Sequence, residues 1–285
     1  MNVSNTWTRK KWIARRKIFR ILVYVGIIVM CLWAVFPLFW MGLLSFKEPI
    51  HSYDPSVWIF KPVINNYISV FTTKNFGKYL LNSSIVAVSA TLLAMVIGTL
   101  AAYGFSRFKF RHNQNFLFVL LSIRMIPGVS IVIPVFLIAS FLRILDSRLL
   151  LIVVYQIITV PFTVWMMKGF FDEIPIELEE AAMIDGCTSF QSLYRIILPV
   201  VQPGLVATSI FCLITSWNEF VYSLFLTSIK AVTTPTIVQM FIAAQGIYWG
   251  EMAAVGTMAI LPVLIFAMIV QKNMIRGLSF GAVKG

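Results

Sequence analysis

The chain has 285 residues, of which 59% are hydrophobic and 12% charged, whereas soluble globular proteins have about 45–50% and about 25%. A chain this apolar cannot cover a soluble fold with polar surface. One membrane anchor could not raise the hydrophobic fraction of all 285 residues to this level. We therefore predict a membrane protein with several spans. Its net charge of +12 then indicates basic cytoplasmic loops beside anionic lipid, and no nucleic-acid partner is expected.

The N-terminal segment combines a basic stretch with a long apolar run. Residues 1–20 hold seven Lys and Arg residues, and the apolar run over 21–45 follows them. The run is far longer than the apolar region of a signal peptide, about 7–15 residues, and no Ala-x-Ala cleavage site follows it. We therefore expect a basic cytoplasmic N-terminus over 1–20 and a retained first transmembrane helix over 21–45.

Five further apolar runs are each long enough to cross a bilayer, which takes about 20 helical residues. We expect an external loop over 46–83 and then a core transmembrane domain over 84–271 that contains all five. The expected helices are 84–105, 116–141, 149–168, 204–226 and 251–271, with an inner loop over 169–203 and a cytoplasmic tail over 272–285. The predicted fold class is all-α, a polytopic membrane protein with six transmembrane helices.

The distribution of Lys and Arg predicts the orientation of the chain. With the N-terminus inside, the inner segments hold 15 of these residues, and the outer loops hold seven. Because cytoplasmic loops carry the excess of Lys and Arg in membrane proteins, both termini are expected in the cytoplasm.

The inner loop contains most of the acidic residues, since six of the 11 lie between positions 172 and 185. Pro175 suits the first turn of a short helix, where its missing N–H costs nothing, and three glutamates follow at the positive end of the helix dipole. Leu178, Ala181 and Ala182 are expected to form a small apolar face. Gly186 then supplies a left-handed helix stop.

A second short helix is expected over 189–198. Thr188 and Gln191 match a capping box at its start, and the helix is expected to end before Pro199. A loop of this length in a compact membrane protein is usually functional. Its acidic flank favours docking to a protein over an amphipathic helix lying on the inner leaflet, because that leaflet is anionic.

Arg124 lies within the third expected span. An ionisable group at bilayer depth costs at least about 2.5–3.5 kcal/mol on insertion scales, so it faces protein or water. Pro127 and Pro134 follow it, and we expect both to break the helix and free backbone carbonyls. Contact of Arg124 with a translocated substrate is therefore a hypothesis.

The fifth expected span contains Trp217, Asn218 and Glu219. An amide and a carboxylate beside aromatic faces suit the recognition of a sugar, and hydrogen bonding between helices is the alternative. At 1.5 Å per residue, Glu219 and Arg124 differ by roughly 10 Å in depth, so each is expected to meet its own partners. The outer segment 243–250 contains two glycines and two aromatic residues, which are also typical of a membrane–water interface.

The sequence offers no site for catalysis or for a cofactor. It has no G-x-x-x-x-G-K-[ST] phosphate-binding loop and no G-x-S-x-G motif, and its two histidines, His51 and His112, lie in loops expected on opposite sides. We expect no catalytic residue, no metal site and no cofactor in this chain.

Several motifs resemble those of binding-protein-dependent ABC importer permeases. The inner-loop segments Glu180-Ala181-Ala182-Met183-Ile184-Asp185-Gly186 and Arg195-Ile196-Ile197-Leu198-Pro199 resemble the E-A-A…G…I-x-L-P signature of that family. Further matches are Asn65 with Tyr67 and Phe71, Asn82-Ser83, Ala101-Ala102-Tyr103 with Arg107, Trp217-Asn218-Glu219-Phe220 and Gly281-Ala282-Val283-Lys284-Gly285. Together they are similar to the carbohydrate-uptake subgroup and its MalG-type inner-membrane subunits. Cys187 stands where members usually carry Ala, which exchanges one small residue for another.

The resemblance implies a type I ABC importer permease fold in the bacterial cytoplasmic (inner) membrane and the uptake of a carbohydrate by alternating access. It implies a second homologous permease subunit, two cytoplasmic ATPase subunits that bind ATP and Mg²⁺, and an extracytoplasmic solute-binding protein as partners. The alternative is a secondary transporter or channel for a small polar solute. Such a protein predicts paired acidic or His residues near the midplane and often internal repeats, and the sequence shows neither.

The resemblance also implies roles for residues at the motif positions. The residues implied to couple the chain to the ATPase are Glu180, Ala181, Ala182, Asp185 and Gly186. The candidates for the translocation pathway are Arg124, Trp217, Asn218 and Glu219. The residues implied to contact the solute-binding protein are Gln245, Gly246, Tyr248 and Trp249.

Overall fold

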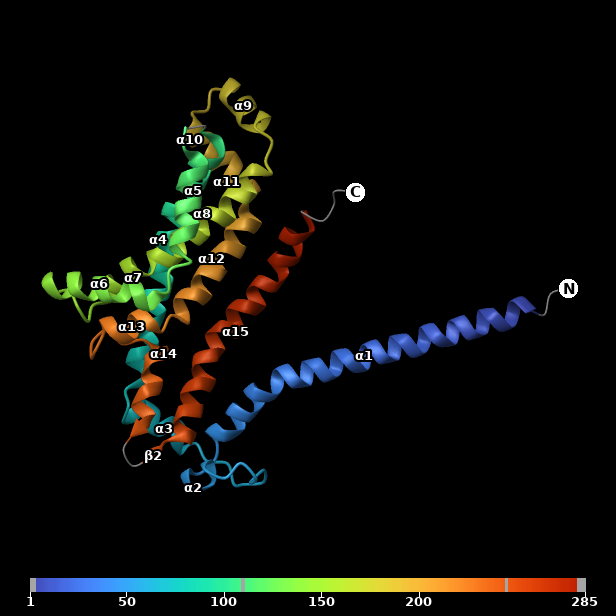
Figure 1. Ribbon diagram of the computed structural model, residues 1–285, viewed down its shortest axis with the longest axis vertical. Helices are drawn as coiled ribbons and strands as arrows, with labels where there is room; N and C mark the ends of the chain where they lie inside the picture. The colour runs from blue at the N-terminus through green and yellow to red at the C-terminus, as the bar shows by residue number, and fades with distance from the viewer. Residues whose placement is uncertain (1–3, 109–110, 244–245, 281–285) are drawn as a thin grey trace. The chain divides into compact units, whose positions relative to one another are not determined.

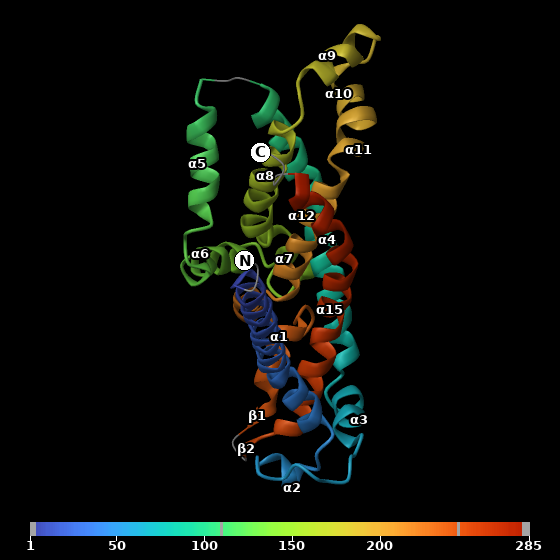
Figure 2. The ribbon, with the colours of Figure 1, turned by 90° about the vertical axis from the view of Figure 1, so that its right-hand side faces the viewer.

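The computed structural model describes residues 4–108, 111–243 and 246–280, and their side chains over 16–108, 111–242 and 246–268. The chain divides into two compact units, Met1–Val70 with Ile247–Thr257 and Phe71–Gly246 with Met258–Gly285. The first unit contains α1 (Ser4–Ser45), α2 (Pro49–Ser52), most of α3 (Asn65–Thr72) and the start of α15 (Trp249–Phe280). Figures 1 and 2 show these elements along the chain.

The second unit holds most of the helices. In chain order its elements are α4 (Phe76–Arg107), α5 (Asn113–Ile123), α6 (Gly128–Phe141), α7 (Arg148–Val154), α8 (Gln156–Asp172), α9 (Glu177–Ile184), α10 (Ser189–Ser192), the π-helical turn η1 (Leu193–Ile197), α11 (Leu198–Val200), α12 (Gln202–Trp217), α13 (Val221–Leu226), α14 (Thr234–Ile237), the 3₁₀ turn η2 (Val238–Phe241) and strand β1 (Ile242–Ala243). Strand β2 (Gly246–Ile247) begins at Gly246, the last residue of the stretch Phe71–Gly246 of this unit. The described residues are thus mostly helical, in agreement with the predicted all-α class.

Among the residues that the structure describes, four helical segments are long and apolar enough to cross a membrane unbroken: Arg16–Ser45, Phe76–Arg107, Arg148–Asp172 and Trp249–Met268. They overlap the first, second, fourth and sixth expected spans. Helix α4 begins at Phe76, earlier than the predicted start at residue 84, and α15 continues to Phe280, beyond the predicted end at 271. The segment expected as the external loop 46–83 contains α2 and α3 as well as the start of α4.

The third expected span is not one straight helix. Helices α5 and α6 form a pair bent by 89° at the break between Ile123 and Gly128, and Figure 1 shows α6 running across the direction of α5. The predicted break at Pro127 is confirmed, because this proline lies at the N-cap of α6. The predicted break at Pro134 is wrong. Pro134 lies inside α6, since one proline removes a single backbone hydrogen bond and the apolar turns on both sides continue the helix.

The fifth expected span, 204–226, is also interrupted. Helix α12 ends at Trp217, and a separate short helix, α13, begins at Val221. The reason lies in Glu219, whose carboxylate accepts hydrogen bonds from the backbone N–H groups of Tyr222 (3.1 Å) and Ser223 (3.4 Å). A carboxylate on the free N–H groups of a first turn starts a new helix, so the continuous apolar run concealed a break.

Helices α4 and α8 pack closely along a stripe of small residues on α4. The buried residues of this stripe are spaced by three or four positions: Ala87, Ala90, Ala94, Gly98 and Ala102. A Cβ atom on Gly98 would lie 2.5 Å from the Cβ of Thr163 on α8. Because lipid provides little hydrophobic drive for helices to associate, such small residues stabilise the pair by letting the two backbones approach.

We predict that Gly98→Ala destabilises the folded protein by about 1–3 kcal/mol, because the added methyl group overlaps Thr163 in a packed interface. The matched control is Gly104→Ala on the same helix, where a Cβ would meet no atom within 4 Å. Thermal unfolding of both variants in detergent provides the measurement. Equal melting temperatures would show that the α4–α8 contact yields to the extra methyl group.

Candidate functional site

The acidic segment of the inner loop forms the short helix α9. Glu177, Glu179 and Glu180 lie in its first turn, as predicted from the helix dipole. At its end Gly186 has φ of +89°, and its N–H donates to the carbonyl of Met183 (3.0 Å) while the Cys187 N–H donates to that of Ala182 (2.9 Å). The predicted left-handed stop is therefore confirmed. Figures 1 and 2 show α9 and α10 together at one end of the second unit.

The second predicted helix of the loop begins as expected. Thr188 and Gln191 form the complete capping box, with N–H···O distances of 3.2 Å and 2.8 Å. Its predicted end before Pro199 is wrong, because α10, η1 and α11 continue the helical backbone to Val200. The π-helical turn explains this difference. In this turn the Leu198 N–H donates to the carbonyl of Leu193, five residues earlier, so the hydrogen-bond pattern shifts just before the proline.

Glu179 is the charged side chain of α9 that points into the protein. Its residue is 3% exposed, and its carboxylate forms an ion pair with Arg107 at the end of α4. The Tyr103 hydroxyl donates a second hydrogen bond to it (2.9 Å), and the Arg107 guanidinium also donates to the carbonyl of Ile174 (3.1 Å). A buried ion pair is stable only when its remaining polar atoms are bonded, and these contacts meet that requirement.

The neighbouring carboxylate, Glu180, is exposed, and so are Ala181, Asp185 and Gly186. Ala182 is 4% exposed and packs inward. The expected apolar face is therefore wrong in part: Glu179 and Ala182 form the inner face, whereas Leu178 is 42% exposed. The predicted coupling residues are thus divided, with Ala182 against the protein and the other four on the surface.

A second contact ties the start of the loop to α4. The Ser106 hydroxyl donates to the Asp172 carboxylate (2.6 Å), which also pairs with Lys168 (2.5 Å) one turn earlier on α8. Both loop contacts with α4 come from the last two turns of that helix. The inner loop is therefore attached to α4 at both Asp172 and Glu179.

Arg124 lies at the break between α5 and α6 and is exposed. Its guanidinium carbon lies 5.0 Å from the centroid of the Phe162 ring on α8, within the range of a cation–π contact. Phe162 in turn packs edge-on against Phe211 of α12, with ring centroids 6.0 Å apart. The helix break thus places one guanidinium beside two aromatic rings.

The structure places the three adjacent pathway candidates in different surroundings. Trp217 is 4% exposed, and its indole N–H donates to the carbonyl of Ala259 (3.1 Å). Asn218 is exposed, with its amide donating to the carbonyl of Ile214 (3.0 Å). Glu219 caps α13, and the ion pairs formed by the described residues do not include one between Glu219 and Arg124.

Asp146 organises the loop between α13 and α14. Its carboxylate accepts hydrogen bonds from four consecutive backbone N–H groups, those of residues 228–231, at 2.9–3.1 Å. Burial alone would raise the pKa of Asp146, but these N–H groups outweigh it and lower the pKa to about 2. From α4, Asn82 donates to the carbonyls of Lys230 (2.9 Å) and Val232 (2.8 Å).

The outer segment contains the residues predicted to contact a solute-binding protein. Gly246 has φ of +134°, and Gln245 lies outside the described residues. Within the first unit, Tyr248 and Trp249 are 43% and 40% exposed. Trp249 lines a cavity of about 480 Å³ together with Trp40 and Tyr53, among others.

Comparison with known proteins identifies the family. Residues 94–280 match the family described as binding-protein-dependent transport system inner membrane component. The chain belongs to this family. Its inner loop contains the sequence Glu180-Ala181-Ala182 on helix α9 and is named the E-A-A loop after it.

Curated relatives extend the similarity to almost the whole chain. The trehalose/maltose transport system permease protein MalG of Thermococcus litoralis is 34% identical and covers 93% of this chain and 97% of its own. The diacetylchitobiose uptake system permease protein DasC of Streptomyces coelicolor is 33% identical, and the match covers 95% of this chain and 100% of its own. A chain from the crystal structure of a bacterial ABC transporter involved in alginate import, 22% identical, superposes with a TM-score of 0.77 over 90% of this chain and 96% of its own, which shows the fold.

Within this inner membrane component, the sequence motif marks Glu180, but the side chain that anchors the loop is Glu179. Its partners Arg107 and Tyr103 stand at the inner end of the second expected span, and nothing in the linear sequence pairs them with the loop. The available signal was the spacing of Glu179 and Ala182, which places both on one side of α9.

We predict that Glu179→Ala destabilises the loop by about 3–5 kcal/mol, because it leaves the Arg107 guanidinium buried without its carboxylate. Glu180→Ala is the matched control, since it removes an exposed carboxylate one residue away. The rate of limited proteolysis between 172 and 203 is the measurement. Exchange of the two charges, Arg107→Glu with Glu179→Arg, should recover part of the protection. Equal cleavage of both single variants would contradict the anchoring role.

Proposed function

We propose that this chain is the permease subunit of an ATP-driven carbohydrate importer in the bacterial cytoplasmic membrane. Membership of the family supports the importer. The substrate class rests on the relatives, because the similar proteins are named for trehalose and maltose and for diacetylchitobiose. The excess of Lys and Arg in the inner segments supports a location of both termini in the cytoplasm.

The proposed topology has six transmembrane helices. Four are the unbroken segments, and the bent pair α5–α6 and helix α12, which follows the bent segment Ser189–Val200, supply up to two more. In this arrangement segments 1–20, 169–203 and 272–285 lie inside and 46–83 lies outside. The core spans over 84–271 then present α9 to the cytoplasm.

The observation that carries the proposal is the division of roles between neighbouring residues of α9. Glu179 and Ala182 hold the helix against the protein, so Glu180, Ala181, Asp185 and Gly186 face outward. A short anchored helix with an acidic, partly apolar outer surface suits insertion into a cleft of a partner. We infer that the partner is a cytoplasmic ATPase that binds ATP and Mg²⁺, two copies of which act with two homologous permease subunits.

In the proposed mechanism, closure of the ATPase pair moves α9, and the ion pair of Glu179 with Arg107 passes this movement to α4. The pathway then switches between inward- and outward-facing states, and a solute-binding protein delivers the sugar outside. We assign Arg124 and Asn218 to the pathway because both are exposed. Trp217 and Glu219 position the helices around it. Gly246, Tyr248 and Trp249, with Gln245, form the proposed contact with the binding protein.

The proposed function is tested by purifying the chain with the products of its neighbouring genes. We expect an ATPase with a phosphate-binding loop to co-purify. After reconstitution with the binding protein, uptake of radiolabelled trehalose, maltose or diacetylchitobiose should stop with vanadate and continue with an uncoupler. Uptake that the uncoupler abolishes would instead indicate a secondary transporter, and ATP-driven uptake of a solute that is not a carbohydrate would refute the substrate class.

We predict that Gly186→Val uncouples transport from ATP hydrolysis, because a β-branched residue at φ of +89° distorts the end of α9. The site has open space, with no atom within 4 Å of an added Cβ, so only the backbone conformation is affected. Gly186→Asn is the matched control, since asparagine tolerates left-handed conformations better. Stimulation of ATPase activity by the loaded binding protein should fall at least about tenfold in the Val variant, an effect of about 1.4 kcal/mol, and less in the Asn variant. Normal stimulation in Gly186→Val would exclude this role.

A further inference from the structure

One exposed face of α8 carries aromatic and charged side chains instead of aliphatic ones. Phe162, Met166, Gly169 and Glu173 recur every three or four residues, which places them in line along the helix, and Trp165 lies beside that line. At 1.5 Å per residue this line extends for about 16 Å. Trp165 is 54% exposed, and Gly169 and Glu173 are also exposed.

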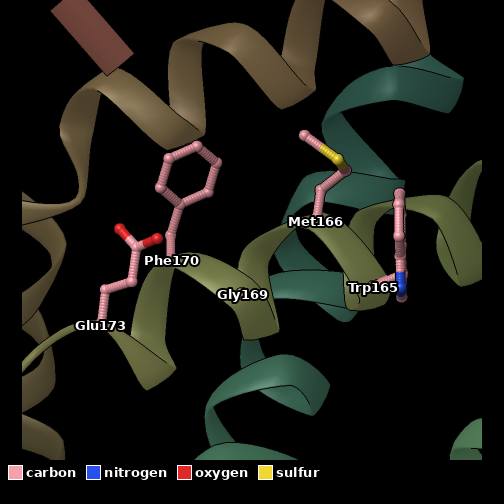
Figure 3. Close-up of a pocket in the computed structure, with 5 residues that line it drawn as sticks. All are labelled: Trp165, Met166, Gly169, Phe170 and Glu173. Carbon is pink, nitrogen blue, oxygen red and sulfur yellow. The ribbon is translucent and has the colours of Figure 1, made fainter. Parts of the chain in front are cut away.

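An open pocket of about 300 Å³ occupies the end of this face near the E-A-A loop. Its lining residues are Trp165, Met166, Gly169, Phe170 and Glu173. Figure 3 shows Gly169 without a side chain between Phe170 and Met166, and the Glu173 carboxylate beside Phe170. The pocket thus combines aromatic walls with one hydrogen-bond acceptor, and its volume lies at the lower end of the range for small-molecule sites, about 300–1,000 Å³.

The other end of the face reaches the helix break. There the Arg124 guanidinium lies 5.0 Å from the Phe162 ring, and the edge of this ring meets Phe211, which is 41% exposed. Thr215, one turn along α12 from Phe211, is exposed as well. One guanidinium and two aromatic rings therefore meet at this point.

The outward face of α4 gives a direct contrast within the same unit. Its exposed residues are aliphatic throughout the span: Leu92, Leu93, Val96, Ile97 and Leu100. Such a surface suits lipid tails, which offer no partner for a polar group. A guanidinium and a carboxylate at the two ends of the α8 face require water or a polar ligand instead.

We propose that the α8 face is a carbohydrate-stacking track of the permease, a proposal that rests on the carbohydrate function proposed above. Phe162, Trp165 and Phe211 stack against the apolar C–H faces of sugar rings, and Arg124 and Glu173 hydrogen-bond hydroxyl groups at its two ends. The ligand is a neutral mono- or oligosaccharide. Weak, repeated stacking suits transport, because a solute must leave each position as readily as it enters.

The test compares aliphatic with aromatic replacements at the same positions. Trp165→Leu and Phe211→Leu should each raise the KM for uptake of radiolabelled trehalose, maltose or diacetylchitobiose about three- to tenfold in the reconstituted importer, the range expected for loss of one aromatic contact. Trp165→Phe and Phe211→Tyr should stay within about twofold of the wild type. Phe118→Leu on α5, a 72% exposed phenylalanine that does not line the pocket, is the control.

Two results would overturn the track. One is an equal KM in the Leu and aromatic variants, which would show that these rings only fill space. The other comes from labelling with a water-soluble trimethylammonium thiosulfonate, which needs no transported sugar. Trp165→Cys should react with this reagent above the background of the native cysteines, and Leu92→Cys on α4 should not. An unreactive Trp165→Cys refutes the track, whereas wild-type protein that carries none of the sugars refutes only the proposed function.

Discussion

The close approach of α4 and α8 is the contact on which the rest of the second unit depends. Small residues on α4, with Gly98 against Thr163, allow the two backbones to meet, and α4 then extends beyond the contact at both ends. At one end Asn82 donates hydrogen bonds to the carbonyls of Lys230 and Val232 in the loop between α13 and α14. At the other end Tyr103 and Arg107 hold α9. One helix of 32 residues, about 48 Å long, therefore connects the loops on the two sides of the unit.

This connection gives the ion pair between Arg107 and Glu179 its importance. A buried pair contributes little net stability, because desolvation of both charges offsets their attraction, but removal of one partner is costly. The contact therefore does more to fix the position of α9 than to stabilise the fold. In the proposed importer such a contact suits the transmission of movement, because it has one geometry in which every polar atom is bonded.

Local sequence signals predicted three local features of the structure. The capping box of Thr188 and Gln191, the turn at Gly186 and the break at Pro127 all depend on neighbouring residues, and the structure confirms each. The end of α12 at Trp217 was missed, because its cause is a carboxylate that caps the next helix within a continuous apolar run. The inward position of Glu179 was missed for a similar reason. Its partners lie more than 70 positions away in the chain, and sequence spacing treats two adjacent glutamates alike.

The aromatic residues show the same limit at the candidate pathway. The sequence made Trp217 a pathway candidate because it stands beside an amide and a carboxylate. In the structure its indole points inward and donates to the Ala259 carbonyl. The rings at the surface come from positions that the sequence keeps apart: half-buried Phe162 and exposed Trp165 on α8, and exposed Phe211 on α12. Only the packing of these helices brings Phe162 beside Arg124 and Phe211 beside Phe162. A surface assembled from three helices around a helix break has no signature in any one segment, so its chemistry emerges from the fold.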